Sequence, residues 1–472
     1  MILRVPRRLT RREAVAITAA APVTLAVQAQ RSTARPNIVY IMADDLGYAD
    51  LSCYGRREYK TTNIDSIGAS GVRLLQAYAN SAVCSATRTA LITGRYQYRL
   101  RIGLEEPLRN AATNIGLPPD VPTLPGLLRK AGYGTTLIGK WHLGRLPAYS
   151  PLKSGYDHFW GFRGGALDYF THKYDTAATD TEDLWDGDVK IHQAGYLTDL
   201  LGDRAVQSIH DYAKAARPFF LSLHFNAPHW PWEGPGDEAE AQRVTSLFDR
   251  DGGSQATYAR MVLRMDFQVG RVLEALQSSG IANNTIVVFT SDNGGERFAD
   301  TWPFTGKKTE LLEGGLRIPA LVRWPGRLRP GSTTNQVAIT MDWVPTFLEA
   351  VGVSADPSSP PDGMSLLPQL TRSAAPVPRK LFWRYQFMQQ RAMREADWKY
   401  LRIDGNEFLF NVADDPLERA NLKARHPEVF RGMLAAYEEW NATMLPDLPD
   451  VQTGPLGYAD ELADHFGVRK KK

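Results

Sequence analysis

The chain has 472 residues, which exceeds the size of one small core, and its 43% hydrophobic and 23% charged residues are ordinary for a soluble globular protein. The formal net charge of +3 includes five arginines and one glutamate among the first thirty residues, so the remainder is nearly neutral. This distribution does not predict a nucleic-acid partner, and the cationic run 469–472 is most simply a solvated end. Since only Cys53 and Cys84 are present, a disulfide framework is excluded.

The N-terminus predicts a targeting segment over residues 1–29. The basic stretch Thr10-Arg11-Arg12 precedes a mildly apolar run, 14–26, and Val27-Gln28-Ala29 offers a small-residue cleavage site. The arginine pair resembles a twin-arginine signal, which implies export to the periplasm or the medium. The alternative is a plain N-terminal extension. No later run approaches the roughly 18–20 apolar residues of a membrane span, so we expect none.

Short apolar runs alternate with longer helical stretches in the following part of the chain. The expected strands are 37–42, 135–138, 219–224, 286–290 and 320–323, and the expected helices include 123–130 and 258–276. This alternation predicts an α/β fold with a mostly parallel, mixed central sheet between helices. We expect a catalytic domain over 30–375.

A proline- and serine-rich stretch, 354–362, predicts a surface loop near the end of that domain. Beyond it, 380–410 alternates like strands joined by turns, and a helix is expected over 427–440. We therefore predict a C-terminal subdomain, 376–472, built from a smaller antiparallel sheet and a helix.

Oxygen-bearing side chains follow two of the expected strands. Asp44 and Asp45 follow the first strand, and Asp292 and Asn293 follow the strand at 286–290. Because ligands bind at the carboxyl ends of parallel strands, these four residues predict a site for a hard cation such as calcium. Each pair taken alone is equally consistent with a turn.

Lysine and histidine side chains follow two further strand candidates. Lys140 and His142 lie in Gly139-Lys140-Trp141-His142, and His229 follows Ala227-Pro228. Such groups can neutralise an anionic substrate and protonate a leaving group. A lone histidine is also often a hydrogen-bonded structural residue.

The segment Cys84-Ser85-Ala86-Thr87-Arg88 resembles the signature of the cysteine-type sulfatases of the alkaline phosphatase superfamily. The similarity runs from Pro36 to about Leu422 and extends to arylsulfatases and N-acetylgalactosamine-sulfate sulfatases. Its further matches, in the family's order, are 44–48, 62–65, 139–144, 227–229, 291–294, Lys308, 313–317 and 397–399.

The resemblance implies that Cys84 is oxidised by a formylglycine-generating enzyme to an aldehyde, which hydrates to a geminal diol. One diol oxygen attacks sulfur, and the second hydroxyl then expels sulfate. It further implies that one divalent cation, calcium or alternatively magnesium, is held by the modified cysteine and four other residues. These ligands are Asp44, Asp45, Cys84, Asp292 and Asn293. Arg88 would orient the diol, while Lys140, His142, His229 and Lys308 would bind sulfate or move protons.

Two departures from the family pattern bear on this expectation. Thr87 stands where the family core usually has serine, so it retains a hydroxyl and adds a methyl group. Several relatives also place a polar sulfate-binding residue near 162–165, and here Arg163, Asp168 or His172 are the candidates. Cys53 has no role that the sequence indicates.

The predicted reaction is hydrolysis of an aryl or carbohydrate sulfate to an alcohol and inorganic sulfate. The nearest alternative is a phosphonate monoester or phosphodiester hydrolase, since relatives of the superfamily share the aldehyde and the metal. An alternative of another class is a non-catalytic binder of sulfated glycans in which Cys84 remains a thiol.

Overall fold

A computed structural model describes residues 35–109, 114–174, 181–243, 247, 252–372, 374–451 and 453–454. The expected targeting segment, 1–29, therefore lies outside the described residues. The chain from residue 35 onward forms one compact unit, and the domain boundary expected after residue 375 stays a prediction. Among the described residues, no helix is long and apolar enough to cross a membrane.

The central sheet has ten strands in the order β11-β2-β10-β9-β1-β8-β4-β5-β6-β7. Its strands are β1 (Asn37–Ala43), β2 (Val72–Leu74), β4 (Gly134–Lys140), β5 (His158–Phe162), β6 (Trp185–Asp186), β7 (Val189–Lys190), β8 (Phe219–His224), β9 (Thr285–Ser291), β10 (Ala320–Arg323) and β11 (Ser332–Thr334). The middle strands β9, β1, β8, β4 and β5 run parallel, whereas β10 is antiparallel to both β9 and β2. The predicted mostly parallel, mixed sheet is confirmed.

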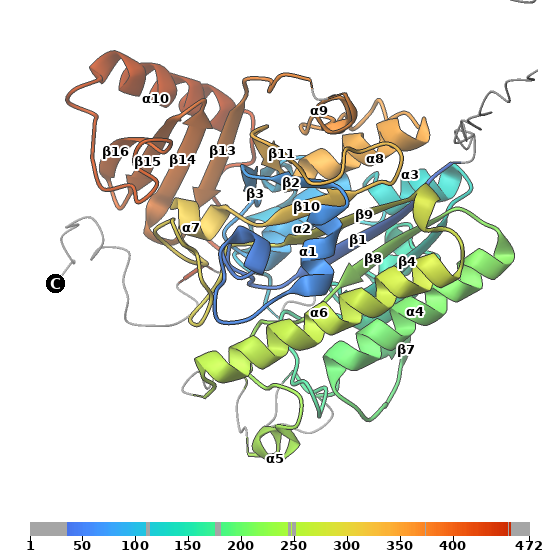
Figure 1. Cartoon of the computed structure of the whole chain (residues 1–472). Coiled ribbons are helices and arrows are strands. Elements are labelled where there is room, and N and C mark those ends of the chain that lie inside the picture. The colour runs from blue at the N-terminus through green and yellow to red at the C-terminus, as the bar shows by residue number, and fades with distance from the viewer. Residues whose placement is uncertain are drawn as a thin grey trace, which may run out of the picture. The chain divides into compact units, whose positions relative to one another are not determined.

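Helices cover both faces of this sheet (Figure 1). The helices are α1 (Thr62–Ala69), α2 (Cys84–Thr93), α3 (Leu124–Lys130), α4 (Leu197–Ala215), α5 (Glu238–Ala241), α6 (Gln255–Ser278), α7 (Glu313–Leu316), α8 (Trp343–Val351), α9 (Leu367–Thr371) and α10 (Pro427–Asn441). On β1, Val39 and Ile41 pack into a core with α4 and α6, while Ile38 and Tyr40 pack into a second core with α3 and α8. Alternate side chains of a strand point to opposite faces, so a strand that is apolar throughout fits a sheet buried on both sides.

A separate antiparallel sheet follows the expected loop, which contains neither helix nor strand over 353–366. It consists of β13 (Lys380–Tyr385), β14 (Gln390–Glu395), β15 (Trp398–Ile403) and β16 (Asn406–Asn411), in sequential order. The helix α10 packs on it with the residues of a third core (Figure 1). The predicted C-terminal sheet and helix are confirmed. A short parallel pair, β3 (Ala77–Tyr78) and β12 (Ala338–Ile339), lies apart from both sheets.

Candidate active site

The carboxyl ends of β1 and β9 bring two distant pairs of residues together. The two strands are parallel neighbours with Ala43 opposite Ser291, so the residues that follow them emerge at one edge. The Asp45 backbone N–H donates to Asp292 Oδ1 at 3.3 Å, and Asn293 Nδ2 donates to Asp45 Oδ1 at 2.7 Å. Together with Asp44 these residues are buried. The structure thus collects the four expected oxygen donors at one point.

Three cations neutralise these carboxylates. Lys308 Nζ lies 2.6 Å from Asp45 Oδ2, and Lys140, at the end of β4, pairs with Asp44. Arg88 on α2 donates to Asp292 Oδ2 at 2.8 Å. All three cations are buried, and removing an ion from water costs several kcal/mol unless it is paired. The pairing therefore explains how so many charges can remain inside the protein.

Cys84 is the first residue of α2, whose ten residues are all buried. Its Sγ and one carboxylate oxygen each of Asp44 and Asp292 lie within 4.8 Å of one another. Burial raises the pKa of the Cys84 thiol, and Lys140 and Lys308 oppose that shift. The positive end of the helix dipole also lies at this residue. The only described cysteine that is fully buried thus faces the carboxylate cluster.

The two predicted histidines are buried and neutral. Burial, with a contribution from Lys140, lowers the pKa of His142 well below its usual value, and burial with Lys308 does the same for His229. His142 Nε2 lies 2.7 Å from the Leu108 carbonyl, and His229 Nδ1 lies 2.6 Å from the Trp230 carbonyl. A carbonyl only accepts, so these nitrogens carry the protons. The lone pairs remain on His142 Nδ1 and His229 Nε2.

Two of the predicted site residues have a backbone conformation that residues other than glycine rarely adopt. Asp45 has a φ of 63° and His142 a φ of 57°. Left-handed backbone at a residue other than glycine is strained and is concentrated at functional sites, where the surrounding structure holds it in place. Here each residue lies two positions after the end of a strand of the central sheet, Asp45 after β1 and His142 after β4.

Two buried oxygens in this cluster have no hydrogen-bond partner, Asp44 Oδ1 and Asn293 Oδ1. Burial and the neighbouring Asp292 carboxylate raise the pKa of Asp44 to about 8. For Asp292, burial is outweighed by Arg88 and Lys140, which lower its pKa. Unpartnered carboxylate and amide oxygens fit a hard divalent cation. Most of these candidate ligands are oxygens, whereas zinc favours sites made mainly of imidazole nitrogens and thiolate sulfurs.

The three candidates left open near 163–172 have different surroundings. Asp168 is buried and its Oδ1 accepts from the backbone N–H groups of Phe170 and Thr171, at 2.9 and 2.6 Å. His172 Nε2 lies 3.1 Å from the Gly195 carbonyl. Both therefore hold the loop in which they lie. Arg163 alone among the three lines the pocket that contains His142.

Thr87 uses its hydroxyl inside the protein. Its Oγ1 accepts from the Ser81 backbone N–H at 3.0 Å and donates to the Ser81 carbonyl at 3.1 Å. These bonds fix the turn that leads into α2, and a serine would make the same pair. The extra methyl group is accommodated without exposure.

The sequence did not single out His224 or Arg145, which the structure places beside the predicted residues. His224 ends β8, and its Nδ1 lies 3.3 Å from an Arg88 guanidinium nitrogen. Arg145 lines the same pocket as His142. Their positions in the sequence could have indicated them, because His224 ends a parallel strand and Arg145 directly follows the 139–144 motif.

The comparisons with known proteins decide the family. A family model described as Sulfatase matches residues 36–353. The chain belongs to the sulfatase family. A second model, described as N-sulphoglucosamine sulphohydrolase, C-terminal, matches residues 304–432.

Several relatives extend the similarity of this sulfatase. It is 28% identical to arylsulfatase J of Mus musculus, over 88% of this chain and 77% of that protein. It is 33% identical to the N-acetylgalactosamine-6-sulfatase of Homo sapiens, over 71% of this chain and 66% of that protein. The solved structure of Ps i-CgsB in complex with k-i-k-neocarrahexaose is 30% identical, with a TM-score of 0.80 over 89% of this chain and 95% of that one. The protein is a sulfuric ester hydrolase, as the sequence predicted.

Proposed function

We propose that this sulfatase hydrolyses carbohydrate sulfate esters with a formylglycine made from Cys84, beside a calcium ion. One observation carries the proposal: Cys84 begins a fully buried helix with its sulfur within 4.8 Å of carboxylate oxygens of Asp44 and Asp292. A structural cysteine has no need of such neighbours. When present, the hydrated aldehyde would supply the nucleophile and the cation would lower its pKa.

The ion would be held by Asp44, Asp45, Asp292 and Asn293, with the modified Cys84 as a further ligand. The unpartnered oxygens of Asp44 and Asn293 support this assignment. In the structure, three carboxylates face the three cations Arg88, Lys140 and Lys308. A divalent cation added to this balanced set leaves a positive excess, which an anionic sulfate ester would neutralise.

The cations and histidines would divide the remaining work. Lys140 and Lys308 would bind the sulfate oxygens, while Arg88 holds Asp292 and orients the residue at position 84. The unprotonated nitrogens His142 Nδ1 and His229 Nε2 are placed to accept and return a proton. His229 Nε2 lies 3.5 Å from Asp45 Oδ2, next to the carboxylate cluster.

The names of the relatives support a sulfated glycan as the substrate. One relative is an N-acetylgalactosamine-6-sulfatase, and one similar structure was solved with a neocarrahexaose. We also propose export by the twin-arginine route from residues 1–29, and a division of the chain into a catalytic domain, 30–375, and a C-terminal subdomain, 376–472.

The proposal is tested by mass spectrometry of the proteolytic peptide that contains Cys84. The protein is produced in a host that has the formylglycine-generating enzyme, and Cys84→Ala serves as the matched control. We expect the peptide to carry an aldehyde in place of the CH2SH group, and turnover of 4-nitrophenyl sulfate to disappear in Cys84→Ala. An unmodified thiol in an active enzyme would remove the formylglycine from the mechanism and favour another nucleophile.

A further inference from the structure

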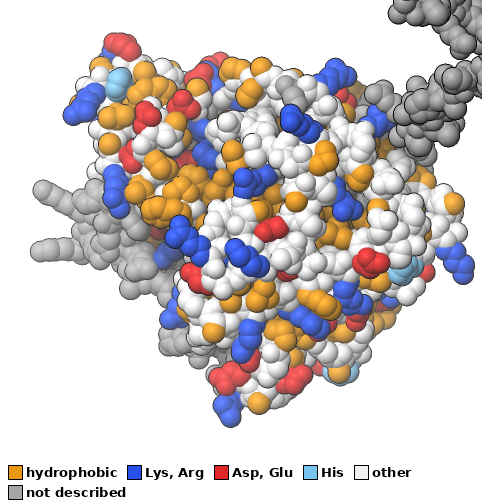
Figure 2. Space-filling view, viewed as in Figure 1, with side chains coloured by type: hydrophobic (Ala, Val, Ile, Leu, Met, Phe, Trp, Pro, Cys, Tyr) orange, Lys and Arg blue, Asp and Glu red, His pale blue; other side chains and the backbone are white. Residues whose placement is uncertain are grey.

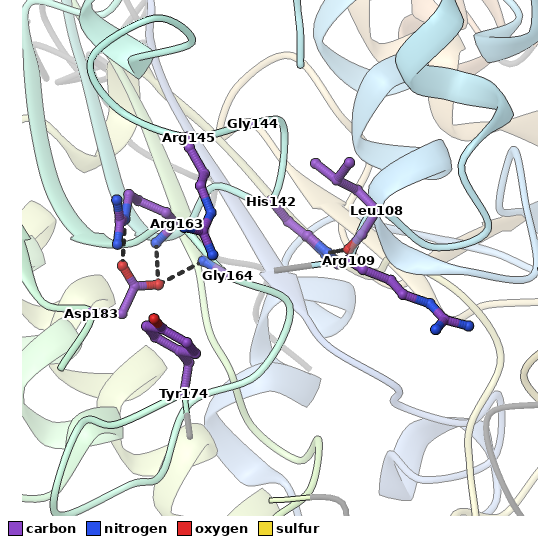
Figure 3. Close-up of a pocket in the computed structure, with 9 residues that line it drawn as sticks. All are labelled: Leu108, Arg109, His142, Gly144, Arg145, Arg163, Gly164, Tyr174 and Asp183. Atoms are coloured by element: carbon purple, nitrogen blue, oxygen red, sulfur yellow. Dashed lines mark hydrogen bonds and ion pairs between the residues drawn. The ribbon is translucent and has the colours of Figure 1, made fainter. Parts of the chain in front are cut away.

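A pocket opens next to His142 and is separate from the carboxylate cluster. The space between its walls, about 320 Å³, includes solvent outside the protein, so the pocket is a shallow opening on the surface. Figure 3 shows its lining, which comes from the segments after β4 and β5 together with Leu108, Arg109, Tyr174 and Asp183. Because His142 is one of the predicted site residues, the pocket adjoins the proposed reaction centre.

Positive charge dominates the pocket. Its lining contains the three arginines Arg109, Arg145 and Arg163 against the single carboxylate of Asp183, and His142 is neutral. By contrast, the face of the molecule seen in Figure 2 carries basic and acidic side chains interspersed over its surface. The pocket is therefore a local concentration of cations in a chain that is nearly neutral.

Arg163 does not supply this excess, because Asp183 neutralises it. Arg163 Nε donates to Asp183 Oδ1 at 2.6 Å, and the backbone N–H groups of Arg163 and Gly164 donate to Asp183 Oδ2 at 3.0 and 2.8 Å. Trp185 also donates to this carboxylate at 2.7 Å, and its ring lies 4.3 Å from the Arg163 guanidinium carbon. Asp183 is thus saturated and holds Arg163 as part of the wall.

Arg145 is the cation whose charge remains available. Among the residues that the structure describes, it has no carboxylate partner, and its recorded side-chain neighbour is the Tyr174 ring, 6.0 Å from the guanidinium carbon. Its side chain is half-buried and points between Arg163 and His142 (Figure 3). Arg109 lies on the opposite rim, is exposed, and directs its guanidinium away from Arg145.

We infer that this pocket binds a second anionic group of the substrate, with Arg145 as its principal partner. The inference rests on the proposed hydrolysis of a sulfate ester at the neighbouring centre. No described carboxylate occupies the donors of this guanidinium, and their planar fork matches a carboxylate or a sulfate. Tyr174 would provide an apolar wall for the ring that carries the group. The substrate class is then a sugar ring, or adjacent rings, with a sulfate ester and one further anion.

The second anion can be another sulfate ester or a carboxylate, and small aryl esters distinguish the two. The probes are phenyl sulfate, the 1,2-, 1,3- and 1,4-benzene disulfates, and the three isomeric carboxyphenyl sulfates. The isomers vary the separation between the two groups. For each probe, kcat/KM is measured for the wild type, Arg145→Met, Arg145→Lys and Arg327→Met. Arg327 is the matched control, because it is an exposed arginine over another ring, Trp324, at 5.5 Å.

The measured quantity is the ratio of kcat/KM for a dianionic probe to that for phenyl sulfate. Differences in leaving group cancel when variants are compared. A charged hydrogen-bonded partner is worth about 1.5–3 kcal/mol, so Arg145→Met is expected to lower the ratio for the best isomer about 10- to 100-fold. Arg145→Lys should recover part of it, and Arg327→Met should leave it unchanged. The better class, disulfate or carboxylate, identifies the source of the anion.

An unchanged ratio in Arg145→Met would overturn the inference, as would a wild type that prefers phenyl sulfate to every dianionic isomer. Should Arg145→Met not fold, the salt dependence of the wild type decides: KM must rise more steeply with ionic strength for the best dianionic probe than for phenyl sulfate. A wild type with Cys84 converted that hydrolyses none of the esters would refute the proposed function itself, which is a different outcome.

Discussion

Replacing Lys399 by methionine tests how the C-terminal sheet is joined to the segment that carries α7. Lys399, on β15, is fully buried, with its Nζ 3.1 Å from Glu313 Oε1 and 2.8 Å from Glu418 Oε1. Glu418 Oε2 in turn accepts from the Glu313 backbone N–H at 2.7 Å. Glu313 begins α7, five residues after Lys308, which pairs with Asp45 in the carboxylate cluster. One lysine thus bridges two segments on either side of this junction.

The expected loss of stability follows from what remains after the substitution. Glu313 keeps its ion pair with Arg317, whose Nε lies 2.8 Å away. Glu418 loses its ion pair with Lys399, the only cation that pairs with it among the described residues. Leaving a buried charge without its partner costs about 3–5 kcal/mol. With an unfolding entropy of about 2.1 cal/mol/K per residue, each kcal/mol lowers Tm of a chain this long by about 1 °C. The expected decrease is therefore about 3–5 °C.

The stability lost in Lys399→Met should also depend on pH. Burial raises the pKa of Glu418 to about 7, although Lys399 opposes the shift. A raised folded pKa means that stability is present below the unfolded value, near 4.5, and is lost as pH rises through 7. Without Lys399 the folded pKa rises further, so the loss continues above pH 7, at up to about 1.4 kcal/mol per pH unit. The difference between wild type and Lys399→Met should thus widen from pH 7 to pH 9.

Thermal unfolding followed by circular dichroism at several pH values measures both effects. The double variant Lys399→Met/Glu418→Gln should recover most of the stability and lose the pH dependence above 7. Lys380→Met is the control, because Lys380 forms an exposed pair with Glu395 at 3.7 Å and such pairs contribute about 0–1 kcal/mol. A decrease for Lys399→Met no larger than that of the control, or one that is constant from pH 7 to 9, would refute the reasoning.

Four further predictions concern the proposed chemistry and export. Removing calcium with a chelator should abolish turnover of 4-nitrophenyl sulfate. Asn293→Leu should raise the calcium concentration that restores turnover at least about tenfold, since one contact to a charged ligand is worth about 1.4 kcal/mol or more. If the wild type and Asn293→Leu both regain turnover at the same calcium concentration, the assignment of Asn293 as a ligand is contradicted. In Thr87→Ser, Cys84 should be converted to formylglycine as completely as in the wild type. Thr87→Val loses two buried hydrogen bonds and should have a Tm about 1–3 °C lower. Parallel assays should give a larger kcat/KM on an aryl sulfate than on the matched phosphonate monoester, and the reverse order would favour the alternative reaction. Changing Arg11 and Arg12 to lysine should retain the protein in the cytoplasm of a bacterial host, and undiminished export would exclude the twin-arginine route.

The local sequence predicted much of the fold and of the candidate site. An apolar run such as that of β1 and β9 identifies a buried strand, and the residue after a strand is fixed by where the run ends. Since parallel strands end at one edge, Asp44 and Asp292 could be expected near each other, although 248 positions separate them. The motif around Cys84 then carried the chemistry through its resemblance to a family. These features depend on short stretches of chain, which a sequence displays directly.

Contacts between segments that pack only in the folded chain could not be predicted in the same way. Nothing local distinguished Arg163 from Asp168 and His172, and only the folded chain shows that Arg163, alone of the three, lines the pocket beside His142. Likewise, the ion pair of Lys399 with Glu418 joins a strand to a later loop. The sequence by itself determined the strands, their ends and the family, because periodicity and motif are local properties. The tertiary structure decided which charges are paired and which, like Arg145, have no carboxylate partner among the described residues, because pairing depends on how distant segments meet.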